Sequence, residues 1–233
     1  TYKNYCPNTP PDLTSWPQRQ SLLRSTMLSS CADIICVQEA SEKSLLAGVD
    51  DFDFLSPSYK SITIKSGRMR IVTFYNHMTL SLADSTSTSE DIYSKDRTVV
   101  IPFTHLSTNK TVWVVNAHLT AGPNGDRRLR QISDALEHVK KRGKKLTLPT
   151  DKIVVCGDFN SDDNEFPSGE TSAITKLLTE GDTGKNFTEL NVVVTKKGKK
   201  QHFGAFTDAY NHAFNNNPPP SMILPSLIPR FVA

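Results

Sequence analysis

The sequence lacks the features that mark several classes of protein. It has no apolar run of the roughly 20 residues that a membrane-spanning helix needs. Its first residues do not follow the charged and then apolar pattern of a secretory signal. The four cysteines form no Cys-x-x-Cys or Cys-x-x-His zinc pattern and suggest no dense disulfide framework. These features favour a globular protein without a membrane span, from a reducing, intracellular compartment.

A strong charge of one sign is missing too. The 233 residues include 27 Lys and Arg against 24 Asp and Glu, a formal net charge of +3. A balance this close to neutral permits a polyanionic partner without requiring one, because binding depends on how charges cluster. Two basic clusters, Lys140–Lys145 and Lys196–Lys200, are expected to be solvated ends of elements, with contact to a phosphate-bearing substrate as the alternative.

Apolar periodicity predicts strands that come mostly in runs, with helices at wide intervals. Helices are predicted over residues 17–30, 41–47, 125–141 and 172–179. Strands are predicted over 32–38, 61–65, 70–75, 98–106, 111–117 and 152–156, with a basic hairpin around 196–200. This order indicates an α+β fold in which sheets pack on one another and helices lie outside.

Three of the buried strands end in polar groups. The first leads to Glu39, the second to His118, and the third to Asp158 and Asn160. An unpaired carboxylate in an apolar setting would cost many kcal/mol, so it must be solvated, paired or bound to metal. A strand that simply surfaces into water explains any one of these ends. Together they supply the carboxylate, imidazole and amide groups that a metal-assisted hydrolase needs.

The chemistry of each group suggests a role. Glu39 is the best ligand for a hard cation such as Mg²⁺, which prefers oxygen. Asp158 is a candidate to orient or deprotonate the attacking water, and Asn160 to fix that carboxylate or hold a phosphate oxygen. His118 is a candidate to stabilise the pentavalent phosphorane or to protonate the leaving oxygen, a proton transfer that typically contributes about 10²–10⁴-fold.

The ordered segments resemble the endonuclease/exonuclease/phosphatase superfamily of metal-dependent phosphoesterases, with its deoxyribonuclease-like and deadenylase-like members. The matching segments are Asp33–Glu39, Asn116–Leu119 and Gly157–Asn160, with weaker matches at Ile71–Tyr75 and at Arg97. The resemblance implies a four-layer α/β/β/α sandwich with the site at the top of the two sheets. It also implies Mg²⁺ or Mn²⁺ as cofactor.

The same resemblance assigns roles residue by residue. Glu39 becomes the metal ligand, His118 the phosphate-contacting catalytic histidine, Asp158 the activating carboxylate and Asn160 its orienting amide. Tyr75 and Arg97 are possible substrate contacts. Specificity in such a superfamily comes from loops around a shared site, so these motifs do not select the substrate.

Two family motifs are missing: the opening strand with a metal-binding Asn, and a closing Ser-Asp-His. We therefore expect residues 1–214 to be a catalytic domain without the first and last strands of the sandwich, inactive as a fragment. Residues 215–233 are expected to be a Pro-rich linker or the start of a further module. Ser221–Pro229 resembles the region bordering an EF-hand insert in one branch of the family, although it contains no EF-hand loop.

Three functions remain open from the sequence. The leading one is a Mg²⁺-dependent phosphodiester hydrolase, a nuclease with nucleic acid as its substrate. The second is a phosphomonoesterase or phospholipase that acts on another phosphoester, such as inositol phosphates or sphingomyelin. The third is a non-catalytic or calcium-regulated scaffold that keeps the fold. The missing terminal motifs favour this last function for the fragment, and the four polar residues at the strand ends argue against it. The oligomeric state is left open.

Overall fold

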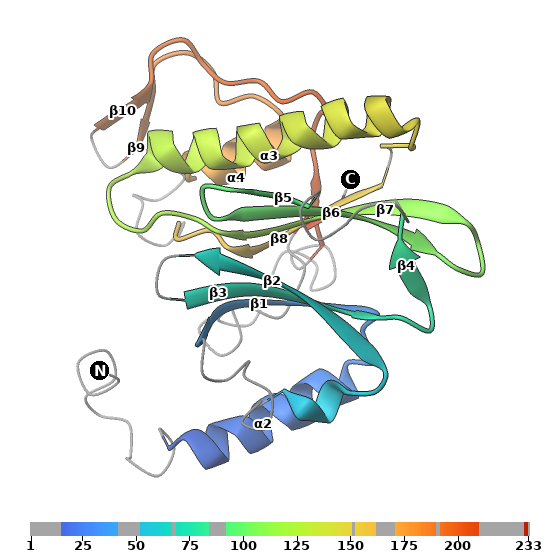
Figure 1. Cartoon of the computed structure of the whole chain (residues 1–233). Coiled ribbons are helices and arrows are strands. Elements are labelled where there is room, and N and C mark those ends of the chain that lie inside the picture. Colours follow the sequence, from blue (N-terminus) through green and yellow to red (C-terminus); the bar gives the residue numbers. More distant parts are fainter. Residues whose placement is uncertain are drawn as a thin grey trace.

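The computed structural model describes residues 15–41, 52–66, 69–83, 92–150, 152–161, 171–189, 192–209 and 231–232. Within these residues two sheets pack face to face, with helix α2 outside one sheet and helices α3 and α4 outside the other (Figure 1). The predicted α+β fold is confirmed. Asp162, Asp163 and the tail 215–230 lie outside the described residues, and so does the predicted helix at 41–47 except Ser41, which ends a strand.

The smaller sheet has three antiparallel strands in the order β1 (Ile34–Ser41), β3 (Met69–Asn76) and β2 (Tyr59–Ser66). Helix α2 (Trp16–Ser29) carries Pro17 in its first turn, where the fixed φ of proline suits the helix and its missing N–H leaves no hydrogen bond unmade. This helix and the short 3-10 helix η2 (Asp53–Leu55) cover the outer face of the sheet. The apolar core there includes Met27, Ile35, Leu55, Val72 and Phe74.

The larger sheet has the order β11 (Thr207–Asp208), β12 (Phe231–Val232), β8 (Ile153–Asp158), β7 (Lys110–His118), β6 (Thr98–His105) and β4 (Leu80–Leu82), and β5 (Tyr93–Lys95) also pairs with β6. The strands predicted over 98–106 and 111–117 form an antiparallel hairpin, because β6 and β7 pair around a turn at 106–109. Strands β7 and β8 are parallel. Their carboxyl ends therefore lie together.

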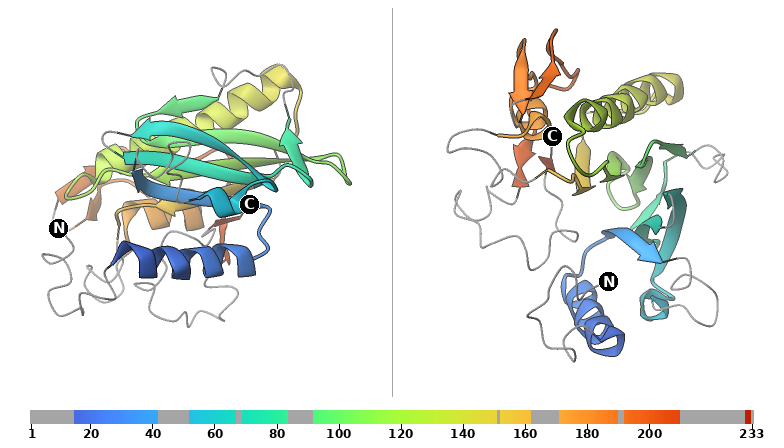
Figure 2. Two further views of the ribbon diagram at one scale, coloured as in Figure 1. Left: turned by 60° about the horizontal axis from the view of Figure 1, so that its bottom comes forward. Right: turned by 90° about the vertical axis from the view of Figure 1, so that its left-hand side faces the viewer.

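Helices α3 (Gly125–Leu146) and α4 (Ala173–Glu180) pack on the outer face of the larger sheet. The first of them, predicted over 125–141, buries an apolar stripe at helical spacing: Leu129, Ile132, Leu136 and Val139. In Figure 2 (right) α2 and α3 lie on opposite outer sides of the two sheets. No helix within the described residues is long and apolar enough to cross a membrane.

The basic hairpin predicted around 196–200 is wrong in its position. The hairpin is formed earlier, by β9 (Phe187–Glu189) and β10 (Val192–Thr195), since the β-branched run Val192–Val194 pairs better than lysines do. The lysines follow it in a turn, and Lys200 forms an isolated bridge with Asp182.

A third apolar core fills the space between the two sheets. Cys36 and Cys156, each within an apolar strand, are buried in it together with Ile71, Val99 and Phe103. A hydrogen bond with Cys36, together with burial, raises the pKa of the Cys156 thiol well above its ordinary value. The three cores lie between four layers: a helix, the smaller sheet, the larger sheet and two helices. The core between the sheets is mainly apolar.

Candidate active site

The register of β7 and β8 places two of the predicted site residues side by side. Across the parallel pair, His118 is opposite Asp158, and Ala117 is opposite Gly157. Side chains alternate between the faces of a strand, and Cys156 lies on the face toward the smaller sheet. Asp158 shares that face with Cys156, and His118 lies opposite it. Both therefore end up at the edge of the inter-sheet core.

Gly157 makes this close register possible. Its φ is 136°, and a Cβ on it would collide with the backbone of Ala117, above all with the carbonyl oxygen. Glycine accepts both the conformation and the close approach of backbone at no steric cost. Any other residue there would force β7 and β8 apart exactly where His118 and Asp158 are paired.

Glu39 reaches the site from the other sheet through a β-bulge. The pairing of β1 with β3 shifts between Val37 and Ala40, and Glu39 has a left-handed φ of 58°. In a regular strand Glu39 would face α2, as Ile35 does. Ala40 takes that face instead, and the bulge re-aims the carboxylate, as bulges near active sites often do. The sequence carries no sign of this device.

The three side chains meet around one ring nitrogen. His118 Nε2 lies 3.6 Å from Glu39 Oε1 and 3.8 Å from Asp158 Oδ2. The imidazole is buried, with 9% of its side chain exposed, whereas Glu39 and Asp158 are 63% and 41% exposed. A buried imidazole thus faces two carboxylates that open to solvent. The structure brings together the groups from three separate strands.

Asn160 joins them through its main chain. Its N–H donates to Asp158 Oδ1 at 2.9 Å, in an Asx turn that Asn160 closes with a left-handed φ of 48°. The side-chain amide donates instead to the Leu119 carbonyl at 2.9 Å. The expectation that this amide orients Asp158 is therefore corrected: the peptide N–H holds the carboxylate, and the amide ties the turn to the end of β7.

A buried polar network connects the two sheets just below the site. Gln38 Nε2 donates to Asn116 Oδ1 at 2.7 Å, and Asn116 Nδ2 donates to the Val72 carbonyl and to Thr73 Oγ1, both at 3.1 Å. Asn116 is completely buried and Gln38 nearly so. Gln38 directly precedes Glu39, and Asn116 comes two residues before His118. This link was missed by sequence reasoning, although each of the two apolar strands carries an amide, Gln38 or Asn116, that signals it.

Buried polar atoms without a hydrogen-bond partner gather at this end of the molecule. Six are found among the described residues, and four of them lie within two residues of Glu39, His118 or Asn160: Gln38 Oε1, His118 Nδ1, Thr120 Oγ1 and Ser161 Oγ. Each such group costs about 1–3 kcal/mol, and native structures contain few. Such groups can accept or donate hydrogen bonds to water or to a bound polar ligand.

The two predicted substrate contacts lie in different places. Tyr75 is buried between the sheets, where its ring packs on Phe103 and burial raises its pKa. It pairs with Ile34, at the opposite end of β1 from Glu39. Tyr75 is therefore not brought to the other residues. Arg97 is brought close, because its carbonyl accepts a hydrogen bond from the His118 N–H at 3.0 Å.

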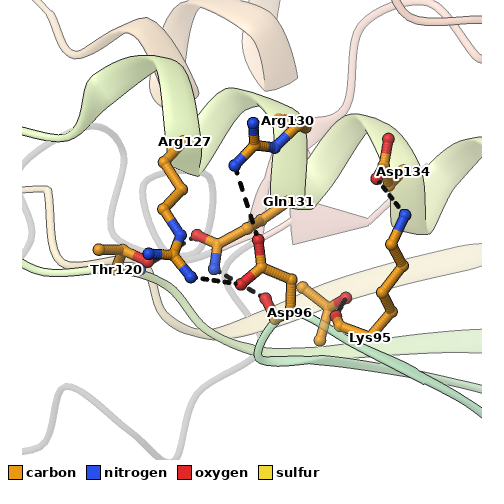
Figure 3. Close-up of polar contacts among 8 residues, drawn as sticks. Lys95, Asp96, Thr120, Arg127, Arg130, Gln131 and Asp134 are labelled. Atoms are coloured by element: carbon orange, nitrogen blue, oxygen red, sulfur yellow. Dashed lines mark hydrogen bonds and ion pairs between the residues drawn. The ribbon is translucent and has the colours of Figure 1, made fainter.

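Arg97 belongs to a strained turn that α3 holds in place. Asp96 and Arg97 connect β5 to β6 with φ values of 45° and 70°, the signs that a two-residue type I′ turn requires. Asp96 accepts from Arg127 Nη2 at 2.8 Å, and Gln131 donates to the Asp96 carbonyl (Figure 3). The bond from Arg127 lowers the pKa of Asp96. For the Arg97 side chain no partner is found within the described residues.

The arginines at the start of α3 have structural partners rather than a free approach to a phosphate. Arg127 binds Asp96, and Arg130 lies 4.0 Å from the same carboxylate. Arg128 is buried against Glu189 at 2.5 Å and also donates to the carbonyls of Thr120 and Gly122, in the loop after His118. This cluster fixes the segment that leaves the site.

The residues present fit a Mg²⁺ that keeps most of its water. Among the described residues no three His, Cys, Asp or Glu side chains are grouped as a closed metal cage. Mg²⁺ does not require one, because it is usually held by one or two carboxylates and several waters. The exposed carboxylate of Glu39, with Asp158 across the imidazole, suits such an open site.

Comparison with known protein families shows which family the chain belongs to. The model of the Endonuclease/Exonuclease/phosphatase family matches residues 4–222, nearly the whole chain. The chain belongs to this family. The match includes every strand that carries a site residue, and the resemblance based on the segments around Glu39, His118 and Asp158 is confirmed.

Relatives of known sequence and structure agree with this assignment. The CCR4-Not complex 3′-5′-exoribonuclease subunit Ccr4 of Candida albicans is 24% identical over an alignment of 245 residues. This match covers 88% of this chain and 29% of that protein. The crystal structure of ANGEL2, a 2′,3′-cyclic phosphatase, has a TM-score of 0.68 at 17% identity and covers 96% of this chain and 75% of its own. The human Nocturnin catalytic domain has a TM-score of 0.60 at 16% identity, covering 94% and 74%.

These comparisons establish the family and the fold, and they do not by themselves establish the activity of this chain. At 16–17% identity the structural matches show a shared fold. The chain spans less than a third of the length of the curated relative it matches. The geometry around His118 therefore carries the functional argument.

Proposed function

We propose that the protein is a divalent-metal-dependent phosphodiester hydrolase, with its catalytic groups at the ends of β1, β7 and β8. The observation that carries this proposal is the meeting of Glu39, His118 and Asp158 around one imidazole nitrogen. These residues come from strands far apart in the sequence and from both sheets. Their family is typically metal-dependent.

Glu39 would hold Mg²⁺ or Mn²⁺ through its exposed carboxylate. When bound, the cation neutralises negative charge on the phosphate and draws the phosphoryl oxygens toward the site. The bulge in β1 serves this role, since it turns Glu39 out of the α2 core and toward the larger sheet.

Asp158 would orient and deprotonate the attacking water. Its Oδ1 is fixed by the Asn160 N–H, so Oδ2, the oxygen nearer to His118, stays available. His118 presents Nε2 to the same space and would donate to a phosphoryl oxygen or to the leaving oxygen. One positioned proton transfer of this kind is worth about 10²–10⁴-fold. Arg97, whose backbone is bonded to His118, is proposed as a further contact to the phosphate.

A nucleic acid is the proposed substrate class. Support comes from the Ccr4 relative, an exoribonuclease subunit by name, and from the fold shared with a 2′,3′-cyclic phosphatase. A phosphomonoester or lipid phosphodiester is the alternative, since the same core can accept either. We further propose that residues 1–214 form the catalytic domain and that sequence outside this chain supplies the opening Asn strand and the closing Ser-Asp-His of a complete four-layer sandwich.

The test is hydrolysis of bis-p-nitrophenyl phosphate and of a single-stranded RNA by the full-length protein. We expect turnover with Mg²⁺ or Mn²⁺ and none with a chelator. His118→Ala and Asp158→Ala should each lower kcat by at least 100-fold without a change in thermal stability that explains the loss. His105→Ala, the same substitution at the far end of β6, is the matched control. Turnover that survives in either variant, or that ignores the chelator, would refute the assignment.

A further inference from the structure

The positive charge of this nearly neutral protein is concentrated on one surface. Residues 137–145 and 196–202 contain nine of its 27 Lys and Arg and one of its 24 Asp and Glu, a net charge of +8. The rest of the chain is therefore negative by five charges, since the total is +3. We call the exposed lysines of these two segments the basic surface: Lys140, Lys141, Lys144, Lys145, Lys196, Lys197, Lys199 and Lys200.

The fold brings the two segments together although 50 residues separate them. His202 Nε2 lies 3.0 Å from Glu137 and its Nδ1 lies 3.3 Å from Lys140 Nζ, so the segment after β10 lies alongside α3. In Figure 1 this segment returns from the β9–β10 hairpin over α3. Glu137, the one acid present, is already engaged by Lys141 at 3.2 Å and by His202.

Most of the positive charge on this surface is left unbalanced. Lys200 pairs with Asp182 at 3.2 Å. The side chains of Lys144, Lys145, Lys196 and Lys197 have no ion pair or hydrogen bond within the described residues. Lysines at the carboxyl end of α3 are favoured by the helix dipole, which accounts for Lys144 and Lys145 alone. Lys196 and Lys197 follow β10, whose Val194 lies against Gly125 at the other end of α3, so the dipole at the carboxyl end does not account for their charge.

From this arrangement we infer that the basic surface binds the sugar-phosphate backbone of a nucleic-acid strand whose scissile phosphate lies at His118. The position of the scissile phosphate at His118 rests on the proposed function. Helix α3 begins seven residues after His118, and its lysines lie roughly 20–30 Å further along at 1.5 Å per residue. A mononucleotide or a small ester cannot span that distance, whereas an extended strand can.

The composition of the surface favours phosphate contacts over other modes of binding. Among the described residues, Trp16, Leu22, Leu28, Met78 and Leu106 are exposed large apolar side chains of other elements, and Val193 is exposed in β10 just before the lysines. Within the described residues the surface thus offers no exposed Phe, Tyr or Trp ring for base stacking and a single exposed valine, too little apolar area for insertion into lipid. Binding should be independent of base sequence and strongly dependent on salt, because it releases counterions from phosphates.

Binding of a fluorescent 20-nucleotide single-stranded RNA by the full-length protein, with a chelator present, tests the inference without any turnover. We compare Lys144→Gln/Lys145→Gln and Lys196→Gln/Lys197→Gln with Arg24→Gln/Lys60→Gln, which removes two charges on the α2 side. Each basic-surface variant should bind about tenfold more weakly near 0.1 M salt, with a salt slope shallower by about 1.4 for two lost contacts. The control should bind like the wild type.

A kinetic arm separates this inference from the proposed function. With Mg²⁺, the basic-surface variants should keep kcat/KM on bis-p-nitrophenyl phosphate and lose it, mainly through KM, on the 20-nucleotide RNA. Equal RNA binding by all variants would overturn the inference while leaving hydrolysis intact. So would tighter binding to phosphatidylserine vesicles than to RNA. A wild type that binds RNA through these lysines yet never cleaves it would instead refute the proposed function.

Discussion

The two sheets contribute to the site in different ways. The larger sheet supplies His118 and Asp158 from regular parallel pairing, in a register that Gly157 permits. The smaller sheet supplies Glu39 from an irregular bulge with a left-handed backbone. One half of the site is therefore a property of sheet geometry, and the other half depends on local strain. The hydrogen bond from Gln38 to Asn116 joins the two sheets next to both halves.

The largest effect is expected on the side of the larger sheet, from Gly157→Ala. The added methyl would collide with the backbone of Ala117, which cannot move without breaking the pairing of β7 and β8. We expect a loss of more than about 4 kcal/mol in the free energy of unfolding, an exceptional value for one methyl. Urea denaturation measures it, with Gly184→Ala as the control at another positive-φ glycine, one with open space around it. A loss of equal size in both variants would contradict the role given to the close approach.

The link between the sheets can be broken by Asn116→Leu. This change leaves Gln38 Nε2 and Thr73 Oγ1 buried without their partner, at about 1–3 kcal/mol for each unsatisfied group. It should also raise the Mg²⁺ concentration for half-maximal activity, because Glu39 is no longer aligned with His118. Thr73→Val removes one bond of the network and should cost about 1 kcal/mol with the Mg²⁺ response unchanged. If Asn116→Leu loses stability but keeps its Mg²⁺ response, the network supports the fold alone.

The bulge on the side of the smaller sheet can be relaxed by Glu39→Gly. Glycine adopts a positive φ without cost, so this variant should be as stable as the wild type or more stable by up to about 1 kcal/mol. Activity with Mg²⁺ should nevertheless be lost, as it should in Glu39→Gln, which keeps the side-chain length. Thermal melting together with a Mg²⁺ titration of turnover checks both. A destabilised Glu39→Gly protein would show that the carboxylate, and not the backbone, holds the bulge.

The smallest effect is expected from Arg127→Ala at the β5–β6 turn. Arg127 lowers the pKa of Asp96, so the stability it provides is present above the ordinary Asp value near 4 and is lost as the pH falls through the lower folded pKa. The melting temperatures of wild type and variant should thus differ modestly at pH 7 and converge in acid. Arg130→Ala, 4.0 Å from the same carboxylate, is the control and should differ less. A difference that persists at the lowest pH would exclude this ion pair as its cause.

Much of the fold could be predicted from the sequence, because its longest elements have clear periodicity. The stripe along α3 and the apolar runs of β1, β7 and β8 appear within one to five residues of their expected bounds. Short strands such as β4, β5 and β9 were missed, since three residues carry no measurable period. The basic hairpin lies earlier than predicted, because the lysines form a turn and the valines before them form the strand pair.

The site could be predicted as a set of residues and not as a geometry. Polar groups at the ends of apolar strands identified Glu39, His118 and Asp158, which the structure brings together. Tyr75 was selected from an apolar segment that proved to be core. The bulge at Glu39 and the peptide N–H of Asn160 are decided by tertiary pairing and by backbone conformation, which no side-chain pattern encodes.

Arg128 has a consequence for how a substrate reaches the catalytic groups. Its guanidinium binds two carbonyls of the loop after His118 and a carboxylate of β9, all in a buried setting. Moving this loop aside would separate Arg128 from its carbonyl partners or from Glu189, and leaving a charge buried without its partner costs about 3–5 kcal/mol. Under the proposed function, a phosphate would therefore reach the buried imidazole from the side of Glu39 and Asp158, the two exposed groups of the site, and the cleaved product would leave by the same side.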